Sequence, residues 1–340
     1  MTENLKATLL YIDNQKIMQS DPMKKLIYIA IFAFTFMANS QELKLSPFSQ
    51  YLVENPFVIS PAYAGVEDVH KLRLSGVAQW LGLKDAPLTQ TLSYDTRFSE
   101  RSGAGVIIYN DRNGNTKQMG LQLTYAHHLT INDTNDQYVS FGISYKFNHF
   151  KINTDNFDDG SGNGHTDPNV GVGESTSNHN FEVGFLYRIE RYFISFNASN
   201  ILKKNLKIFD DSEPIKLRNY YLYTGYTFES DNQEYEYEPS IYFKYFEGDG
   251  RSASDLNFKA RKLTDDGYMW AGINARFIND QSSEPVSISP LIGINKKDFY
   301  VGYGFQWNIN DASAFNSSGT HLLTLGYNFA TDRNNASWFK

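Results

Sequence analysis

The chain has 340 residues, including 23 Tyr and 25 Phe but no Cys, and its formal net charge at pH 7 is −7. Without cysteine it has no disulfide framework, no cysteine-ligated zinc site and no thiol nucleophile. A general nucleic-acid-binding protein should present a basic face, so the negative charge argues against that function and leaves room only for a local basic patch.

Residues 23–40 have the pattern of a secretory signal peptide. Two lysines precede an apolar run over residues 26–37, and small residues stand just before Gln41. The run has about a dozen residues, whereas a membrane-spanning helix needs roughly 20, so a helical anchor is the weaker alternative. Residues 1–22 do not fit the basic n-region of a signal peptide, because they contain Asp13 and Asp21. We expect them to be an extension upstream of the true start at Met23, an ordered extension being the alternative.

The next segment, residues 41–68, is apolar but interrupted by prolines. It contains ENPFVISPAYAGVED, with Pro56 and Pro61 inside the apolar stretch. Proline disrupts both a helix interior and a central strand. Exposing each large apolar side chain to water would cost about 1.5–3 kcal/mol. The segment is therefore predicted to be buried against the rest of the protein, and a loose N-terminal arm is the alternative.

Residues 69–330 alternate apolar and polar side chains with the period of a β-strand. In VSFGISYKF, for example, Phe141 and Ile143 oppose Gly142. Pro290 lies inside the twelfth strand, where it removes a hydrogen-bond donor from the ladder. The alternation predicts about fourteen strands, which cover residues 70–80, 87–98, 103–110, 117–130, 136–149, 178–190, 192–200, 217–229, 235–247, 252–263, 267–279, 285–295, 298–308 and 320–330.

The character of the two faces separates a membrane barrel from a soluble sandwich. The polar face carries Gly, Ser, Thr, Asn and Gln with few charges, and the apolar face carries aromatic residues toward the strand ends. After Gln41 no apolar run is long enough for a spanning helix, which leaves an exported soluble protein or a closed barrel. The faces are those of an outer-membrane barrel, and strands of about ten residues can cross a bilayer when tilted.

We therefore predict an all-β fold, a transmembrane antiparallel β-barrel of about 14 strands over residues 69–330. Residues 41–68 would pack at its periplasmic mouth or in its lumen, and residues 331–340 would form a C-terminal tail. Connections after even-numbered strands are short and those after odd-numbered strands are mostly longer, as expected for periplasmic turns and extracellular loops. The longest loops, residues 151–177 and 201–216, are candidates for contacts with an outside partner.

Two places invite a metal-site interpretation. His127 and His128 are adjacent, but neighbouring side chains of a strand point to opposite faces, so the pair cannot chelate one ion. We expect His127 on the lipid-facing side. An acidic loop offers a weak calcium candidate at Asp155, Asp159 and Asp167. Phe157 replaces one ligand of the calcium-loop pattern and the final Glu is missing, so a plain acidic extracellular loop is the leading interpretation.

No catalytic set is recognisable. The chain has seven His, no Cys and no G-x-S-x-G elbow, which leaves little from which to build a triad. We predict a protein that is not an enzyme and that needs no cofactor. An outer-membrane hydrolase, with catalytic residues drawn from distant strands, is the alternative.

At its start the mature chain resembles a known family. QYLVENPFVISPAYAG (residues 50–65) is similar to the Q-Y-x-x-N-P-x-x-I-N-P-A-Y-A-G opening of the PorP/SprF family, with Ser60 where the family usually has Asn. AQWLGLKDAPLTQTLSYDT (residues 78–96) resembles the family's Q-W-x-G-x-x-G-A-P-x-T-Q-T-L-S, with Asp85 replacing Gly. The matching motif residues are Asn55, Pro56, Pro61, Ala62, Tyr63, Ala64, Gly65, Gln79, Trp80, Gly82, Ala86, Pro87, Thr89, Gln90 and Thr91.

The resemblance implies a non-enzymatic outer-membrane protein of the type IX secretion and gliding-motility apparatus of Bacteroidota. It also implies partners: other type IX secretion components, and a secreted surface protein, such as an adhesin with a type B C-terminal domain, that the barrel helps to export or retain. A core subunit that links the translocon to a periplasmic ring and an outer-membrane diffusion channel are the alternatives. The barrel would contact outer-membrane lipid and no nucleic acid. Its motif residues would serve as turn and packing residues or as partner contacts.

Overall fold

The computed structural model describes residues 54–67, 69–80, 85–152, 175–202, 218–248, 250–279, 283–309 and 319–330. Several predictions lie outside these residues: the upstream extension, the signal peptide, Gly82, the calcium candidates and the C-terminal tail. Most of the two longest predicted loops, residues 151–177 and 201–216, also lies outside the described residues. Among the described residues, no helix is both long and apolar enough to cross a membrane.

The described chain forms two short 3₁₀ helices followed by strands that pair antiparallel with their neighbours. The helices are η2 (Pro56–Val58) and η3 (Pro61–Tyr63). The strands are β1 (Val69–Gln79), β2 (Leu88–Ser99), β3 (Ser102–Asn113), β4 (Thr116–Asn132), β5 (Gln137–Ile152), β6 (Ser175–Ile189), β7 (Tyr192–Ser199), β8 (Asn219–Tyr226), β9 (Phe228–Glu229), β10 (Tyr235–Phe246), β11 (Ser252–Thr264), β12 (Gly267–Asn279), β13 (Ser283–Lys296), β14 (Phe299–Asn308) and β15 (Thr320–Ala330).

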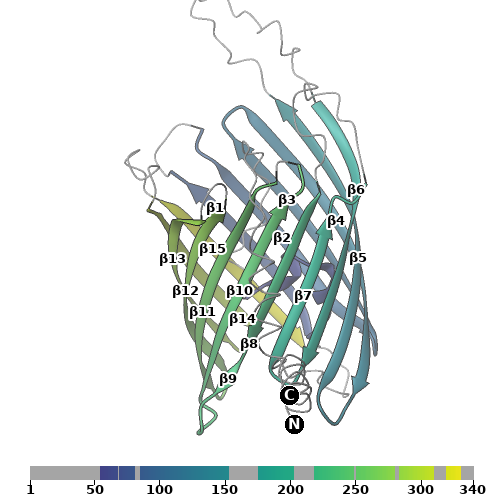
Figure 1. Ribbon diagram of the computed structural model, residues 1–340, viewed down its shortest axis with the longest axis vertical. Coiled ribbons are helices and arrows are strands. Elements are labelled where there is room, and N and C mark those ends of the chain that lie inside the picture. The colour runs from purple at the N-terminus through teal and green to yellow at the C-terminus, as the bar shows by residue number, and fades with distance from the viewer. Residues whose placement is uncertain are drawn as a thin grey trace, which may run out of the picture. The chain divides into compact units, whose positions relative to one another are not determined.

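The sheet closes on itself into a barrel (Figure 1). β1 pairs with β2 on one side and with β15 on the other, from Val69 opposite Ala330 to Gln79 opposite Thr320. β10 likewise joins β8 to β11. β8 and β9 follow one another along the same edge of β10, so together they occupy one strand position in the barrel wall. The 15 labelled strands therefore fill 14 positions, and the predicted 14-stranded antiparallel barrel is confirmed.

Prolines explain two of the irregular places in the ladder. One continuous strand was expected over residues 217–229, but the pairing of β10 with this edge stops at Ser240 and resumes at Tyr237, which leaves Pro239 outside it. Proline has no amide hydrogen to donate, so the strand divides there into β8 and β9. The predicted loss at Pro290 is also seen, because β13 and β14 share no register pair at that residue.

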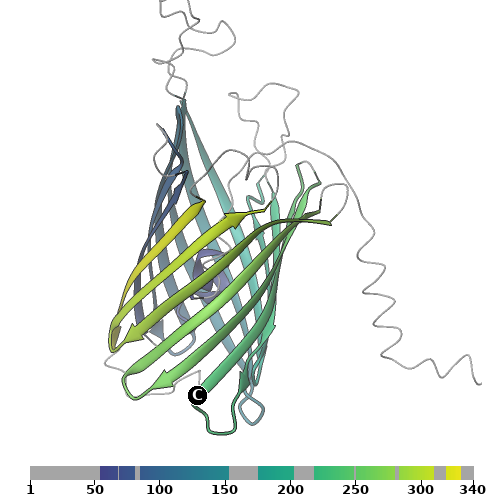
Figure 2. The same ribbon diagram turned by 90° about the vertical axis from the view of Figure 1, so that its left-hand side faces the viewer.

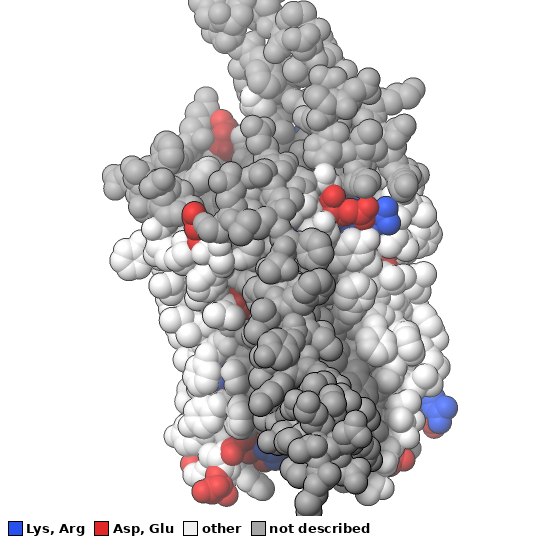
Figure 3. Space-filling model, in the orientation of Figure 1, with Lys and Arg blue, Asp and Glu red and all other residues white. Residues whose placement is uncertain are grey.

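The two faces of the wall differ as the alternation predicts. Leu123 and Ile143 point outward with about half of their surface exposed, whereas Gln122 and Thr124 are buried toward the interior. Figure 3 shows an outer surface on which the described acidic and basic side chains gather mainly toward the two ends. Each strand backbone pairs with both neighbours around the closed barrel, so an apolar outer band can face lipid.

The two ends of the barrel have different connections. At one end the turns between described strands have two to five residues, as between β2 and β3 or between β6 and β7. At the other end the connection between β5 and β6 runs over residues 153–174. By the usual asymmetry of outer-membrane barrels, the short-turn end faces the periplasm.

Residues 54–67, here called the plug, lie inside the barrel, where η3 contacts β4, β5 and β6. They are visible as the purple coil between the strands in Figure 2. Phe57, Ile59, Ala62 and Ala64 are almost completely buried. The apolar segment around Pro56 and Pro61 thus buries its side chains within the barrel rather than in lipid or water.

The lipid-facing assignment can be tested with a matched pair of substitutions. Ile143 is 47% exposed near the middle of β5, and Ile131 is 58% exposed near the short-turn end of β4. We expect Ile143→Arg to lower the free energy of unfolding in lipid vesicles by about 2–4 kcal/mol, and Ile131→Arg by about 0–1 kcal/mol, because the cost of a charge falls toward the membrane surface. Equal effects in a denaturant titration would contradict the assignment.

Candidate functional site

The plug is built from two proline-started turns. Pro56 opens η2 and Pro61 opens η3. The first position of a helix needs no amide donor and suits the fixed φ of proline, so both prolines stand where they are tolerated. Ser60 caps η3, its hydroxyl accepting a hydrogen bond from the Ala62 amide at 3.4 Å. Short turns replace the strand that the prolines forbid.

Glycines on the inner wall make room for the plug. A β-carbon on Gly103 would lie closer than 3.0 Å to the backbone of Ala64, and one on Gly142 equally close to the backbone of Pro61. Gly184 leaves similar space for Ser60. Real β-carbons do not approach backbone atoms this closely, so the plug backbone lies directly on the strand backbones, and a side chain at these wall positions would displace it.

The end of the plug is held by hydrogen bonds to β2 and β4. The Gly65 amide donates to Asp95 at 3.0 Å, and Arg97 Nε donates to the Gly65 carbonyl at 2.9 Å. His128 Nε2 lies 3.0 Å from the carbonyl of Ala64, which can only accept, so this nitrogen carries the proton. Gly65 has φ +67°, a left-handed conformation that favours glycine.

Two further contacts tie the plug to strands on different sides of the lumen. Asn55 Nδ2 donates to the hydroxyl of Ser93 on β2 at 3.1 Å. Asn197 Nδ2 on β7 donates to the carbonyl of Ile59 at 2.6 Å. Buried polar groups are costly unless they are paired, so these bonds fix the plug in one position.

Glu54, at the start of the plug, reaches the opposite wall. Its carboxylate is 7% exposed and lies 3.5 Å from Lys259 and 3.2 Å from Arg261 on β11, and it accepts a hydrogen bond from the hydroxyl of Tyr268 on β12 at 2.8 Å. Burial by itself opposes ionisation, but the two cations outweigh it and hold the pKa of Glu54 below its ordinary value. The plug therefore spans the lumen from β2 to β11 and β12.

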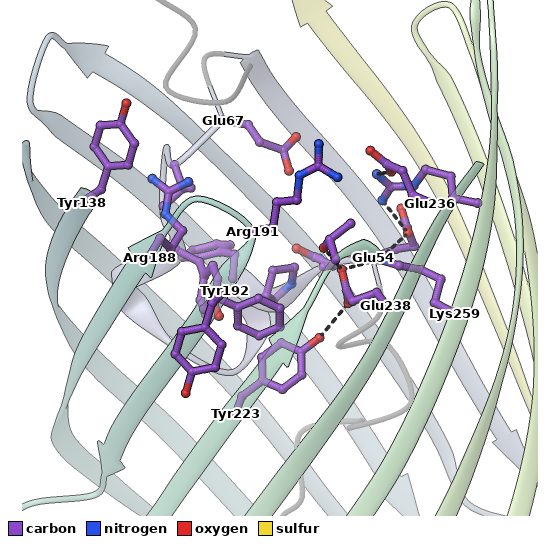
Figure 4. A pocket seen from close by; sticks show the side chains of 18 of the residues that line it. Glu54, Glu67, Tyr138, Arg188, Arg191, Tyr192, Tyr223, Glu236, Glu238 and Lys259 are labelled. Atoms are coloured by element: carbon purple, nitrogen blue, oxygen red, sulfur yellow. Dashed lines mark hydrogen bonds and ion pairs between the residues drawn. The ribbon is translucent and has the colours of Figure 1, made fainter. Parts of the chain in front are cut away.

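The same cations belong to a wider charge network. Lys259 lies 3.3 Å from Glu238, and Arg261 lies 3.0 Å from Glu236, both on β10. Arg261 also lies over the ring of Tyr268, 4.4 Å from its centroid. Figure 4 shows Glu54, Glu238 and Lys259 pointing toward one another. Each cation is shared between the plug and the wall, so the network couples the plug to β10 and β11.

A cavity of about 740 Å³, here called the mouth cavity, lies between the plug and the short-turn end of the wall (Figure 4). Asn55, Phe57 and Tyr63 line it from the plug, and exposed Asp136 and Glu190 line it from the short turns. Among its described lining residues eight are Asp or Glu, five are Lys or Arg and seven are Tyr or Phe. The cavity is therefore both acidic in balance and rich in aromatic rings.

The motif residues that the sequence singled out fall into two groups that lie apart. Asn55, Pro56, Pro61, Ala62, Tyr63, Ala64 and Gly65 are in the plug. The second group lies on both sides of the β1–β2 connection, at the long-loop end of the barrel. There the amide of Trp80, at φ 51°, donates to the carbonyl of Gly319 at 3.1 Å. Gln79, Ala86, Pro87, Thr89 and Gln90 lie near it, and Thr91 is buried toward the lumen. One motif therefore builds the plug and the other shapes the opposite rim.

His127 and His128 separate as expected. His128 is buried, with Nδ1 2.8 Å from the hydroxyl of Ser140, while His127 is half-buried beside Tyr125. Among the described residues, no group of three or more His, Asp or Glu side chains could hold a metal ion.

The sequence-based choice of residues missed Glu54, Lys259, Arg261 and the wall glycines. Glu54 stands beside the family motif but was not distinguished from it, and the two cations lie some 200 residues downstream. A signal for the glycines was present, because Gly142 and Gly184 occupy polar-face positions of long strands where a glycine weakens pairing.

Comparison with known proteins identifies the family of the chain. The family model of the type IX secretion system membrane protein PorP/SprF matches residues 40–327. The chain belongs to the PorP/SprF family. It is accordingly an outer-membrane β-barrel of the type IX secretion system, and nothing in the family assignment indicates a catalytic role. No curated protein sequence matches the chain.

Solved structures share the fold at low sequence identity. The "CymD monoaromatic hydrocarbon channel" is 11% identical, with a TM-score of 0.52 over 84% of this chain and 94% of that chain. The Ralstonia pickettii toluene transporter TbuX is 8% identical, with a TM-score of 0.49 over 81% and 92%. The Acinetobacter baumannii outer membrane protein Omp33 is 8% identical, with a TM-score of 0.40 over 78% and 100%. At 11% identity, the likeness to CymD supports a shared fold and nothing more.

Proposed function

We propose that this PorP/SprF barrel is a non-enzymatic type IX component that binds a secreted partner protein and supports its export or its retention at the cell surface. The expected partner is an adhesin with a type B C-terminal domain. The observation that carries the proposal is the plug, which crosses the lumen and bonds to strands on different sides of it. A barrel whose lumen is filled by a buried segment of its own chain is better suited to bind a protein than to pass small solutes.

The fold likeness to a hydrocarbon channel favours the alternative of a diffusion channel only at the level of architecture. The plug weighs against it, because Phe57, Ile59 and Ala62 are buried where a water-filled path would run. A role as a core subunit contacting periplasmic components is the stronger alternative, and the mouth cavity on the short-turn side favours it.

Affinity purification of the full-length barrel from native membranes tests the proposal. We expect a secreted surface protein and at least one other type IX component to be recovered with it, and an unrelated outer-membrane barrel purified in parallel to recover neither. Recovery of periplasmic components without any secreted protein would favour the core-subunit role. Recovery of no type IX component or surface protein, together with steady conductance of the purified barrel in a planar bilayer, would favour the channel.

A further inference from the structure

The mouth cavity has the size and position of a binding site for part of another chain. Its volume of about 740 Å³ falls in the roughly 300–1,000 Å³ range of ligand pockets. The plug closes it on the lumen side with Asn55 and Phe57, while the exposed Asp136 and Glu190 line it on the short turns. An occupant would therefore enter from the periplasmic side and end against the plug.

The charges of the cavity favour a positive occupant. Eight carboxylates face five Lys or Arg among the described lining residues. Four of the five positive groups lie against carboxylates of the same lining: Lys259 and Arg261 against Glu54, Lys71 against Glu67, and Arg191 against Glu229. The net charge of the lining that meets an incoming ligand is therefore negative. A cavity with low-dielectric walls strengthens the field of such a surplus.

The rings of the cavity suit the same occupant by a different interaction. Phe193 and Tyr223 pack with centroids 4.8 Å apart, and Tyr138 and Tyr192 lie near the short turns. The cavity lining already contains one contact between a cation and an aromatic ring, because the Arg188 guanidinium lies over the ring of Tyr138, 5.1 Å from its centroid. Lysine and arginine combine an apolar stem with a cationic head, so they can lie on aromatic faces while the head meets a carboxylate.

We propose that the mouth cavity binds a lysine- or arginine-bearing segment of a periplasmic protein partner. The proposal rests on the partner-binding part of the proposed function, because it names the chemistry of one contact by which a protein on the periplasmic side, the secreted partner in transit or another type IX component, docks on this barrel. The aromatic lining and the surplus of carboxylates carry it together, and the plug gives the segment a floor on which to end. Contacts of this kind steer association and select the partner by charge complementarity.

The test uses the purified full-length barrel in detergent and two fluorescent ten-residue peptides. One peptide carries three Lys or Arg and two aromatic residues, and the other carries Glu in place of the basic residues. We expect the cationic peptide to bind at least about tenfold more tightly at low ionic strength, and its affinity to fall as salt rises. Equal binding of the two peptides, or binding that is insensitive to salt, would overturn the proposal.

A pair of charge-matched variants locates the binding. Asp136→Asn with Glu190→Gln removes two carboxylates of the cavity, whereas Glu100→Gln with Asp265→Asn removes two exposed carboxylates of other short turns. We expect the first pair to weaken cationic-peptide binding about five- to tenfold and the second to change it by about twofold or less. Circular dichroism checks that both variants keep the barrel. Equal weakening by both pairs would overturn the assignment to the cavity.

The outcome separates the two proposals. The peptide measurement uses the barrel alone, so it does not depend on recovering a partner from membranes. If partners are recovered but the peptides show no preference, the cationic-segment proposal fails and the partner-binding function stands. If the cationic peptide binds as expected but no type IX component or surface protein is recovered, the proposed function fails instead.

Discussion

Replacing Gly142 by alanine is expected to displace the plug. The new β-carbon would fall within 3.0 Å of backbone atoms of Pro61 and Ala62, and a backbone cannot yield as the end of a flexible side chain can. Since overpacking of a tight contact costs about 1–3 kcal/mol, the thermal unfolding temperature of the purified barrel should fall. The displaced segment should become sensitive to limited proteolysis. Gly103→Ala should act in the same way, because its β-carbon would meet the backbone of Ala64.

The matched control for this prediction is Gly76→Ala. Gly76 lies on β1, and a β-carbon added there has no atom within 4 Å. It should therefore keep the wild-type unfolding temperature and the protease resistance of the plug. Bilayer recordings add a functional measure, because a displaced plug should raise the conductance of Gly142→Ala but not of Gly76→Ala. A Gly142→Ala barrel with wild-type stability, protection and conductance would show that the plug is not seated on these glycines.

Glu54→Gln is expected to loosen the other end of the plug. The change removes the carboxylate that faces Lys259 and Arg261 and leaves two largely buried cations with one partner fewer. Breaking a buried ion pair typically costs about 3–5 kcal/mol. Because both cations keep a carboxylate of β10, we expect a smaller loss of about 2 kcal/mol. Glu100→Gln, on an exposed short turn, is the control and should change the free energy of unfolding by less than about 0.5 kcal/mol.

The same network predicts how stability depends on pH. The pKa of Glu54 is lowered in the folded protein, so its ionised form stabilises the fold above the ordinary glutamate pKa near 4.5. This contribution is lost as the pH falls from that value through the lower folded pKa. The difference in free energy of unfolding between the wild type and Glu54→Gln should therefore be largest above about pH 5 and should shrink as the pH falls below 4.5 through the lower folded pKa. A constant difference across this range would mean that the charge of Glu54 contributes nothing.

The barrel itself was predictable because its signal is local. Side chains of a strand alternate between faces every second residue, so a run such as the one through Phe141 and Ile143 reports both the strand and its two environments. Pro290 could be recognised for the same reason, since proline lacks a donor wherever it stands. The apolar stretch with Pro56 and Pro61 also indicated a segment that is buried but not a strand.

The contacts that hold the plug in the barrel were decided by tertiary structure alone. Glu54 meets Tyr268 across 214 positions of sequence, and Asn197 meets the carbonyl of Ile59 across 138. Such pairs depend on the register of every intervening strand and on the closure of β1 against β15, and no local pattern encodes them. The wall glycines show most clearly what a local pattern cannot predict. The alternation places Gly142 on the inner face, but only the folded plug explains why no side chain fits at that position.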